Sequence, residues 1–211
     1  MKPITYITFL LAIIFTACSK KNTKVDVDPG GPVTINGTSY PTVKIGSQTW
    51  TSVNYNGPGG MNYNGTANDP VYGKLYTYTE AEAISLPAGW HLSTESDFTT
   101  LFSALGVAPA PTGQNFYLLP ISLGQQLMST TTWYNPIGNN NTGFNAVAAG
   151  IAIGGFANYK QFIAEFLTSS KFPNGNNVSF AIDEHISPTV VYLNSLAATD
   201  VDGGSVRFVK N

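Results

Sequence analysis

The clearest periodicity in the chain lies between residues 88 and 106. Thr94, with Asp97 three positions later, has the pattern of a helix N-cap, and Gly106 stands where a left-handed C-cap ends a helix. Between them, apolar residues recur at i, i+3, i+4 and i+7, the spacing that places side chains on one helix face: Phe98, Leu101, Phe102 and Leu105. The stretch predicts an amphipathic helix against which the strands of the domain pack.

Short runs before this helix predict two β-hairpins. Residues 33–35 and 38–40 flank Asn36-Gly37, and residues 42–45 and 48–55 flank Gly46-Ser47. Dipeptides of this kind accept the positive φ angles of two-residue hairpin turns. Trp50, in the middle of the last run, is expected to anchor the core.

The remaining elements are shorter. Residues 72–79 are interpreted as a strand end, and residues 79–86 as a brief helix capped by Thr79 with Glu82 in the third position. Further along we expect a helical turn at 123–128, a buried run at 144–153, strands at 179–182, 190–193 and 205–209, and a last turn at 202–204. Many short strands with two early helices predict an α+β domain.

Residues 1–17 have the pattern of a bacterial signal peptide. The apolar run from Ile4 to Phe15 is too short to span a bilayer, which needs about 20 residues. Small residues before Cys18 resemble a lipobox, so Cys18 is expected to carry a lipid that anchors the protein to the outer membrane, on its periplasmic or its surface face. The alternative is an ordinary secretory signal with an incidental cysteine. Residues 18–32 are polar and predict a flexible tether, and residues 33–211 then form one domain.

Composition excludes several classes of function. Charged residues are 10% of the chain and aromatic residues 12%, against a usual charged share of about 25%, which favours a folded domain with a neutral surface. A net charge of −2 with scattered basic residues argues against binding to nucleic acid. The single cysteine allows neither an intramolecular disulfide nor a thiolate metal cluster.

Four segments in order carry a family resemblance: VKIGSQTWTSVNYN at 43–56, VYGKLYTYTEA and LPAGWHLSTESDFTTL within 71–101, LGQQLMSTTTW and NNNTGFNAVAAG within 123–150, and GGSVRFVKN at 203–211. Together they resemble the Fibrobacter succinogenes major paralogous domain, common in exported proteins of Bacteroidetes-type bacteria. The chain departs from the family pattern at Ser93, Phe98 and Phe208. That family is similar in turn to formylglycine-generating sulfatase-modifying enzymes and to C-type lectins, which implies a single C-type-lectin-like domain.

The sequence gives no support for catalysis. The related oxidase needs reactive cysteines, and none remains beyond Cys18. His91 is expected to be structural, and the cluster of Asp183, Glu184 and His185 is expected to be a solvated turn rather than a cation site. Asp200 and Asp202 give only a fragment of a calcium loop. We therefore expect no enzyme activity, no cofactor and no resident metal.

Binding is the better-supported class of function. Asn-rich loops at 56–68, 135–143 and 174–177 lie near Tyr63, Trp133 and Tyr134, and aromatic faces with amide groups are suited to neutral sugars. The alternative is that Trp133 packs in the core and the Asn residues only satisfy turns. The leading hypothesis is a non-catalytic, lipid-anchored envelope module that binds a polysaccharide or an envelope protein. A structural or adhesive subunit of a fimbria-like surface assembly is the alternative.

Overall fold

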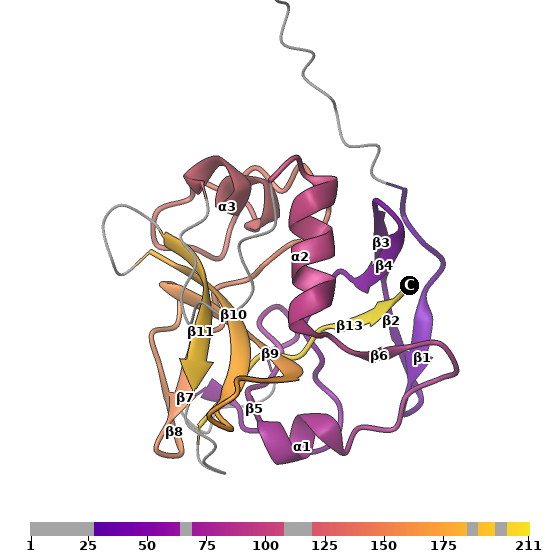
Figure 1. Ribbon diagram of the computed structural model, residues 1–211. Helices are drawn as coiled ribbons and strands as arrows, with labels where there is room; N and C mark the ends of the chain where they lie inside the picture. The colour runs from indigo at the N-terminus through magenta and orange to yellow at the C-terminus, as the bar shows by residue number, and fades with distance from the viewer. Residues whose placement is uncertain (1–27, 64–68, 108–119, 185–189, 197–201) are drawn as a thin grey trace, which may run out of the picture.

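The computed structural model describes residues 28–63, 69–107, 120–184 and 202–211, together with the backbone of residues 190–196. The proposed leader, Cys18 and most of the proposed tether lie outside these residues. The described elements are β1 (Val33–Ile35), β2 (Thr38–Tyr40), β3 (Thr42–Ile45), β4 (Gln48–Thr51), β5 (Tyr76–Thr77), α1 (Tyr78–Glu82), β6 (His91–Leu92), α2 (Glu95–Ala104), α3 (Ile121–Leu127), β7 (Ile151–Ile153), β8 (Phe156–Asn158), β9 (Ile163–Lys171), β10 (Asn177–Asp183), β11 (Val190–Leu196), β12 (Gly203–Gly204) and β13 (Phe208–Lys210). Figure 1 shows α2 standing beside the strands that follow it and the ones that precede it.

The strands form small antiparallel sheets, so the prediction of an α+β domain with short antiparallel strands is confirmed. Their orders are β3-β4-β13-β6, β5-β12-β7-β8, β11-β10-β9 and the hairpin β1-β2. The last strand, β13, lies between β4 and β6, with Val209 opposite Trp50 on one side and His91 on the other. The end of the chain is therefore built into the sheet formed by its beginning (Figure 1).

Both predicted hairpins are present. Asn36 and Gly37 take φ angles of 48° and 78° in the β1–β2 turn, and Gly46 takes 61° in the β3–β4 turn. These left-handed conformations match the right-handed twist of the flanking strands, which explains the choice of turn residues.

Helix α2 is the organising helix that the periodicity predicts. The Thr94 side chain accepts a hydrogen bond from the backbone N–H of Asp97, and the Asp97 carboxylate accepts one from the backbone N–H of Thr94. This capping box contributes about 1 kcal/mol to the helix. The apolar stripe packs on β9 and β10, where the Phe98 ring lies 4.5 Å from that of Phe180 and 5.1 Å from that of Trp50. The expectation that Trp50 anchors the core is confirmed, since its side chain is fully buried.

Three local predictions need correction. Helix α1 is capped by Thr77 with Glu80 in the third position, not by Thr79 with Glu82. Gly203 and Gly204 form strand β12 rather than a turn; a Cβ on Gly203 would lie 2.0 Å from the Tyr76 carbonyl oxygen, so only glycine permits this pairing with β5. The expected helical turn at 123–128 is a third helix, α3. Among the described residues, no helix has the length and apolar character needed to cross a membrane.

Candidate functional site

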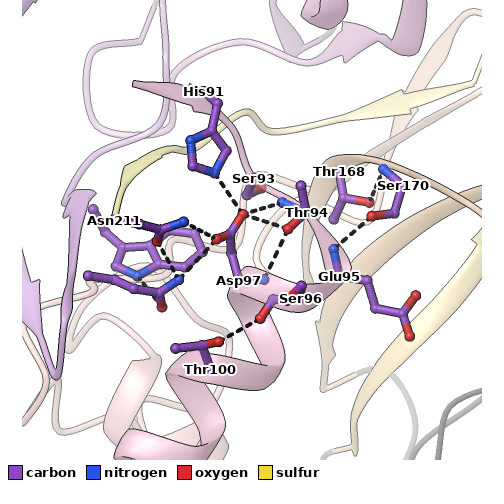
Figure 2. Close-up of polar contacts among 12 residues, drawn as sticks. His91, Ser93, Thr94, Glu95, Ser96, Asp97, Thr100, Thr168, Ser170 and Asn211 are labelled. Atoms are coloured by element: carbon purple, nitrogen blue, oxygen red, sulfur yellow. Dashed lines mark hydrogen bonds and ion pairs between the residues drawn. The ribbon is translucent and has the colours of Figure 1, made fainter. Parts of the chain in front are cut away.

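The two histidines were the first candidates for chemistry, and His91 is engaged in a structural network. Its Nε2 lies 2.9 Å from Oδ2 of Asp97, and because a carboxylate only accepts, Nε2 carries the hydrogen. The same carboxylate accepts from the backbone and hydroxyl of Thr94, from the side chain of Gln48 and from that of Asn211. Figure 2 shows these groups converging on Asp97 from β6, the start of α2 and the end of the chain.

The electrostatics of this cluster favour the ionised form of the Asp97 carboxyl group. Burial by itself raises the pKa of Asp97, but the hydrogen bonds from Thr94, His91 and Asn211 outweigh it and bring the pKa below its ordinary value. The carboxylate thus caps α2 and joins it to Gln48 on β4 and to Asn211, the residue after β13. These contacts agree with the expected structural role of His91.

Trp133, one of the three proposed ligand-binding residues, cannot present a ring to a ligand. Its side chain is 4% exposed and belongs to the main hydrophobic cluster. Its indole N–H donates to the carbonyl oxygen of Ala146 at 3.0 Å. The interpretation of Trp133 as a stacking platform is therefore wrong in this fold, and the alternative, a core residue, holds.

Tyr134, the next residue, points outward. Its side chain is 65% exposed and its ring stacks on that of Phe162, with centroids 5.0 Å apart and planes 26° apart. The backbone N–H of Tyr134 donates to the carbonyl oxygen of Gln161 at 2.8 Å. The exposed ring thus packs against Phe162 on one face, and a hydrogen bond to Gln161 holds the backbone of Tyr134.

Tyr63, the third candidate, lies near Lys160, which is in the loop that also contains Gln161 and Phe162. The ammonium group of Lys160 lies 5.6 Å from the Tyr63 ring centroid and 3.9 Å from that of Tyr72, both within cation–π range. Lys160 also lies 3.7 Å from the carboxylate of Asp69. We use the term aromatic surface for the group formed by Tyr63, Tyr72, Tyr134, Lys160 and Phe162.

The loop that joins these residues is held in an uncommon conformation. Tyr159 and Gln161 have φ angles of 59° and 73°, a region that costs a residue with a side chain about 1–3 kcal/mol. The loop is fixed because the N–H of Gln161 donates to the carbonyl of Ala148 at 2.8 Å, and because Gly150, with φ of +85°, lets the chain approach closely. Strain of this kind that the surroundings enforce is typical of functional loops.

A buried carboxyl group lies behind the aromatic surface. Glu184 is 9% exposed; its Oε2 accepts from the backbone N–H of Asn135 at 3.2 Å, and its own N–H donates to the Phe162 carbonyl. Its Oε1 is buried with no hydrogen-bond partner among the residues described. Burial raises the pKa of Glu184, and the bond from Asn135 offsets this only in part. Its neighbour His185 lies outside the described residues.

Sequence reasoning missed Lys160, Tyr72 and Phe162. The segment from Asn158 to Phe162 follows the Gly154-Gly155 turn and combines two aromatic residues with a lysine and a glutamine. This composition was the available indication of a binding loop, but the order of residues in the chain does not show that the loop lies near Tyr63 or Tyr134.

A second candidate is a cleft of about 630 Å³ beside Trp90. We call it the Trp90 cleft. Trp90 is partly buried and packs against the second core cluster, around residues such as Tyr55 and Phe208. The walls come from the first hairpins, the segment before β6 and the end of the chain: residues 30–34, Lys44, Ser47, Thr49, Pro87, Trp90, Lys210 and Asn211.

No cluster of three or more His, Cys, Asp or Glu side chains that would hold a metal ion occurs in the part of the chain that the structure covers. Asp202 accepts a hydrogen bond from the backbone N–H of Gly154 at 2.8 Å. Asp200, the other half of the calcium-loop fragment, lies outside the described residues.

Comparison with known proteins gives one finding. The family model described as the Fibrobacter succinogenes major domain matches residues 43–210, which include both candidate surfaces apart from residues 30–34 and Asn211 of the cleft. Searches of curated proteins and of solved structures gave no match.

Proposed function

The chain belongs to the Fibrobacter succinogenes major domain family, and we propose that it is a non-catalytic, lipid-anchored cell-envelope protein whose domain binds a glycan. The observation that supports this most is the Tyr134 side chain, which is 65% exposed while its ring stacks on Phe162 and its backbone N–H donates to the Gln161 carbonyl oxygen. A ring that is already stacked on a neighbour loses less conformational freedom when a ligand binds to its exposed face.

The chemistry around this ring suits a neutral sugar. The flat face of an aromatic side chain packs against the apolar face of a pyranose, while nearby polar groups bind hydroxyls. The exposed Gln161 and Asn135 side chains supply amides next to the ring, and Lys160 supplies an ammonium group between Tyr63 and Tyr72. The low charge of the chain, 10% Asp, Glu, Lys and Arg, is consistent with a neutral ligand.

The location of the protein in the cell envelope is part of the same proposal. Cys18 is the only cysteine and follows an apolar run with small residues before it, the pattern of a lipidation site. The domain is proposed to have a C-type-lectin-like fold, and the small antiparallel sheets with helix α2 beside them are compatible with that assignment. Replacing Cys18 with Ala is expected to move the protein from the membrane fraction to the soluble fraction. Retention in the membrane fraction would contradict the lipid anchor.

Binding is tested by screening the purified full-length protein in detergent against an array of plant and host glycans, with and without Ca²⁺. For any glycan that binds, Tyr134→Ala should weaken the affinity about two- to tenfold, the range expected for one aromatic stacking contact. Tyr134→Phe should retain the stacking contact. The thermal unfolding of both variants should stay close to that of the wild type, because the ring is exposed.

Ile121→Ala is the matched control, since Ile121 is another exposed apolar side chain, 42% exposed on α3. It should leave glycan binding unchanged. A blank array with correctly folded protein, or binding that Tyr134→Ala does not weaken, would contradict a glycan site at the aromatic surface.

A second function, a structural or adhesive subunit, is favoured by one observation. Strand β8 is the edge of its sheet, and the hairpin it forms with β7 carries Phe156 at 76% and Ile153 at 48% exposure. An edge strand with exposed apolar side chains can pair with another chain. Phe156→Asp should then abolish self-association in sedimentation velocity; a protein that is monomeric before the substitution would exclude this function.

A further inference from the structure

The Trp90 cleft carries an inference about the membrane. We propose that this cleft docks the domain onto the anionic headgroups of the lipid bilayer in which Cys18 is anchored. The inference depends on the lipid anchor of the proposed function, but not on glycan binding. It assigns to the domain a second binding face and a fixed orientation on the bilayer.

The cleft is positively charged. The charged side chains that line the cleft are Lys44 and Lys210, and both are exposed. None of the residues that line the cleft is an Asp or a Glu, so its side chains carry a net positive charge. A basic residue next to an anionic lipid surface strengthens binding about fivefold, since each contributes about 1 kcal/mol.

Trp90 has a side chain suited to the membrane surface. An indole has an apolar body and a polar N–H, and tryptophan is enriched where hydrocarbon meets water at the membrane surface. Trp90 is partly buried and packs against the core, so its ring is held at the cleft rather than being free in solvent. The combination of an indole with two ammonium groups fits a phosphate-bearing headgroup with its glycerol portion.

The walls of the cleft are fixed, so the site is preformed. The Thr42 hydroxyl donates to the Gly31 carbonyl at 2.9 Å, and the Lys44 N–H donates to the Asp28 carbonyl at 2.9 Å. Asn211 is held by Gln48 at 3.0 Å and by Asp97 at 3.2 Å. A preformed site binds without the entropic cost of ordering its walls.

The chain between Cys18 and the cleft is short. The structure begins at Asp28, two residues before the cleft, and Cys18 lies ten residues earlier. Ten residues span about 36 Å at most, so the cleft is confined to a shell near the bilayer surface. In this segment Lys20, Lys21 and Lys24 outnumber the one acidic residue, Asp26, so its net positive charge favours the same anionic surface. Confinement raises the effective concentration of headgroups at the cleft, so weak contacts suffice for docking.

The protein itself provides the reporter for a test. It has three tryptophans, of which Trp50 is 0% and Trp133 4% exposed, whereas Trp90 lines the cleft. The full-length protein, processed and purified from membranes, is reconstituted into nanodiscs of phosphatidylcholine alone or with phosphatidylglycerol. Both kinds of disc carry a lipid with a spin-labelled headgroup, which quenches nearby tryptophan fluorescence.

We expect Trp90 to be quenched in anionic discs and not in neutral ones, and Trp90→Phe to remove the quenched component. Replacing both Lys44 and Lys210 with Gln should lower the docking equilibrium constant about 25-fold, fivefold for each lysine. Lys171→Gln is the matched control, because Lys171 is exposed and lies outside the cleft lining. Circular dichroism confirms that each variant is folded.

Several outcomes would overturn the proposal. Equal quenching in neutral and anionic discs would exclude a role for headgroup charge, and so would an equal effect of Lys171→Gln and the double substitution. A change in Trp90 fluorescence caused by soluble glucuronate in neutral discs would make the cleft an acidic-sugar site instead. Protein absent from the discs would refute anchor and docking together, whereas anchored protein with unquenched Trp90 would refute docking alone.

Discussion

Replacement of Arg207 is the most informative perturbation of this fold. Its side chain is fully buried, and its guanidinium donates to Asn54 Oδ1 and to the backbone carbonyls of Thr51, Phe144 and Asn145 at 2.7–2.8 Å. All four acceptors are neutral. Burial lowers the pKa of Arg207 to about 9, so the group is charged at pH 7. One cation thus joins β4, the segment after residue 143 and the chain just before β13.

The expected loss of stability follows from these contacts. Arg207→Met removes four donors, and each buried acceptor left without a partner costs about 1–3 kcal/mol. Removing a desolvated charge returns several kcal/mol, so the net loss should be about 3–5 kcal/mol, a large part of a typical 5–15 kcal/mol. Arg207→Lys keeps the charge but cannot reproduce the fork of donors, and should cost about 2–4 kcal/mol.

Urea unfolding followed by circular dichroism and tryptophan fluorescence measures both losses. Lys171→Met, a cation-to-methionine change at an exposed position, should shift the free energy of unfolding by less than about 0.5 kcal/mol. A loss below about 1 kcal/mol for Arg207→Met, with an unchanged m-value, would refute the reasoning. It would show that water or rearrangement satisfies the four oxygens.

Three other changes test the remaining structural assignments. Asp97→Asn should lower the free energy of unfolding at pH 7 by about 1–2 kcal/mol, measured by thermal unfolding, because a cap is lost. Since the folded-state pKa of Asp97 lies below its ordinary value, its contribution is present above about pH 4 and is lost on acidification, so the variant should show a smaller acid-induced loss than the wild type. Trp90→Ala should lower the free energy of unfolding, measured in urea, by less than Trp50→Ala does, because Trp90 is only partly buried. The loss expected for Trp50→Ala is about 3–5 kcal/mol. Equal losses for the two variants would contradict the place of Trp90 in the cleft. Gly150→Ala should lower the melting temperature and weaken glycan binding, because the new Cβ would lie 2.2 Å from the Asn158 carbonyl oxygen; a variant with wild-type binding would show that the loop tolerates displacement.

Local elements of the fold were predictable because their determinants lie within a few residues. The stripe and capping box of α2 depend on contacts three or four positions apart, and the Asn36-Gly37 turn depends on the φ angles of two neighbours. The family match was predictable for a related reason, since its motifs are short segments in a fixed order.

Local patterns fail where two readings are equally good. Thr77 with Glu80 and Thr79 with Glu82 both have capping-box spacing, and the sequence interpretation chose the second. Strand β5 pairs with β12 through Tyr76 and Thr77, so the strand ends at Thr77. The helix therefore begins after Thr77, which makes Thr77 with Glu80 the capping box. The deciding contact lies more than a hundred positions away in the chain.

The candidate sites show the same division between sequence and tertiary structure. The sequence by itself determined that the chain carries an α+β domain with an amphipathic helix, low charge and exposed amide-rich loops. It offered Trp133 and Tyr134 as equivalent neighbours, and only the folded chain buries the first against Ala146 and exposes the second on Phe162. The aromatic surface and the Trp90 cleft are likewise assembled from segments far apart in sequence. Burial and proximity depend on which strands pair and in what order, and these long-range contacts leave no periodic trace in the sequence.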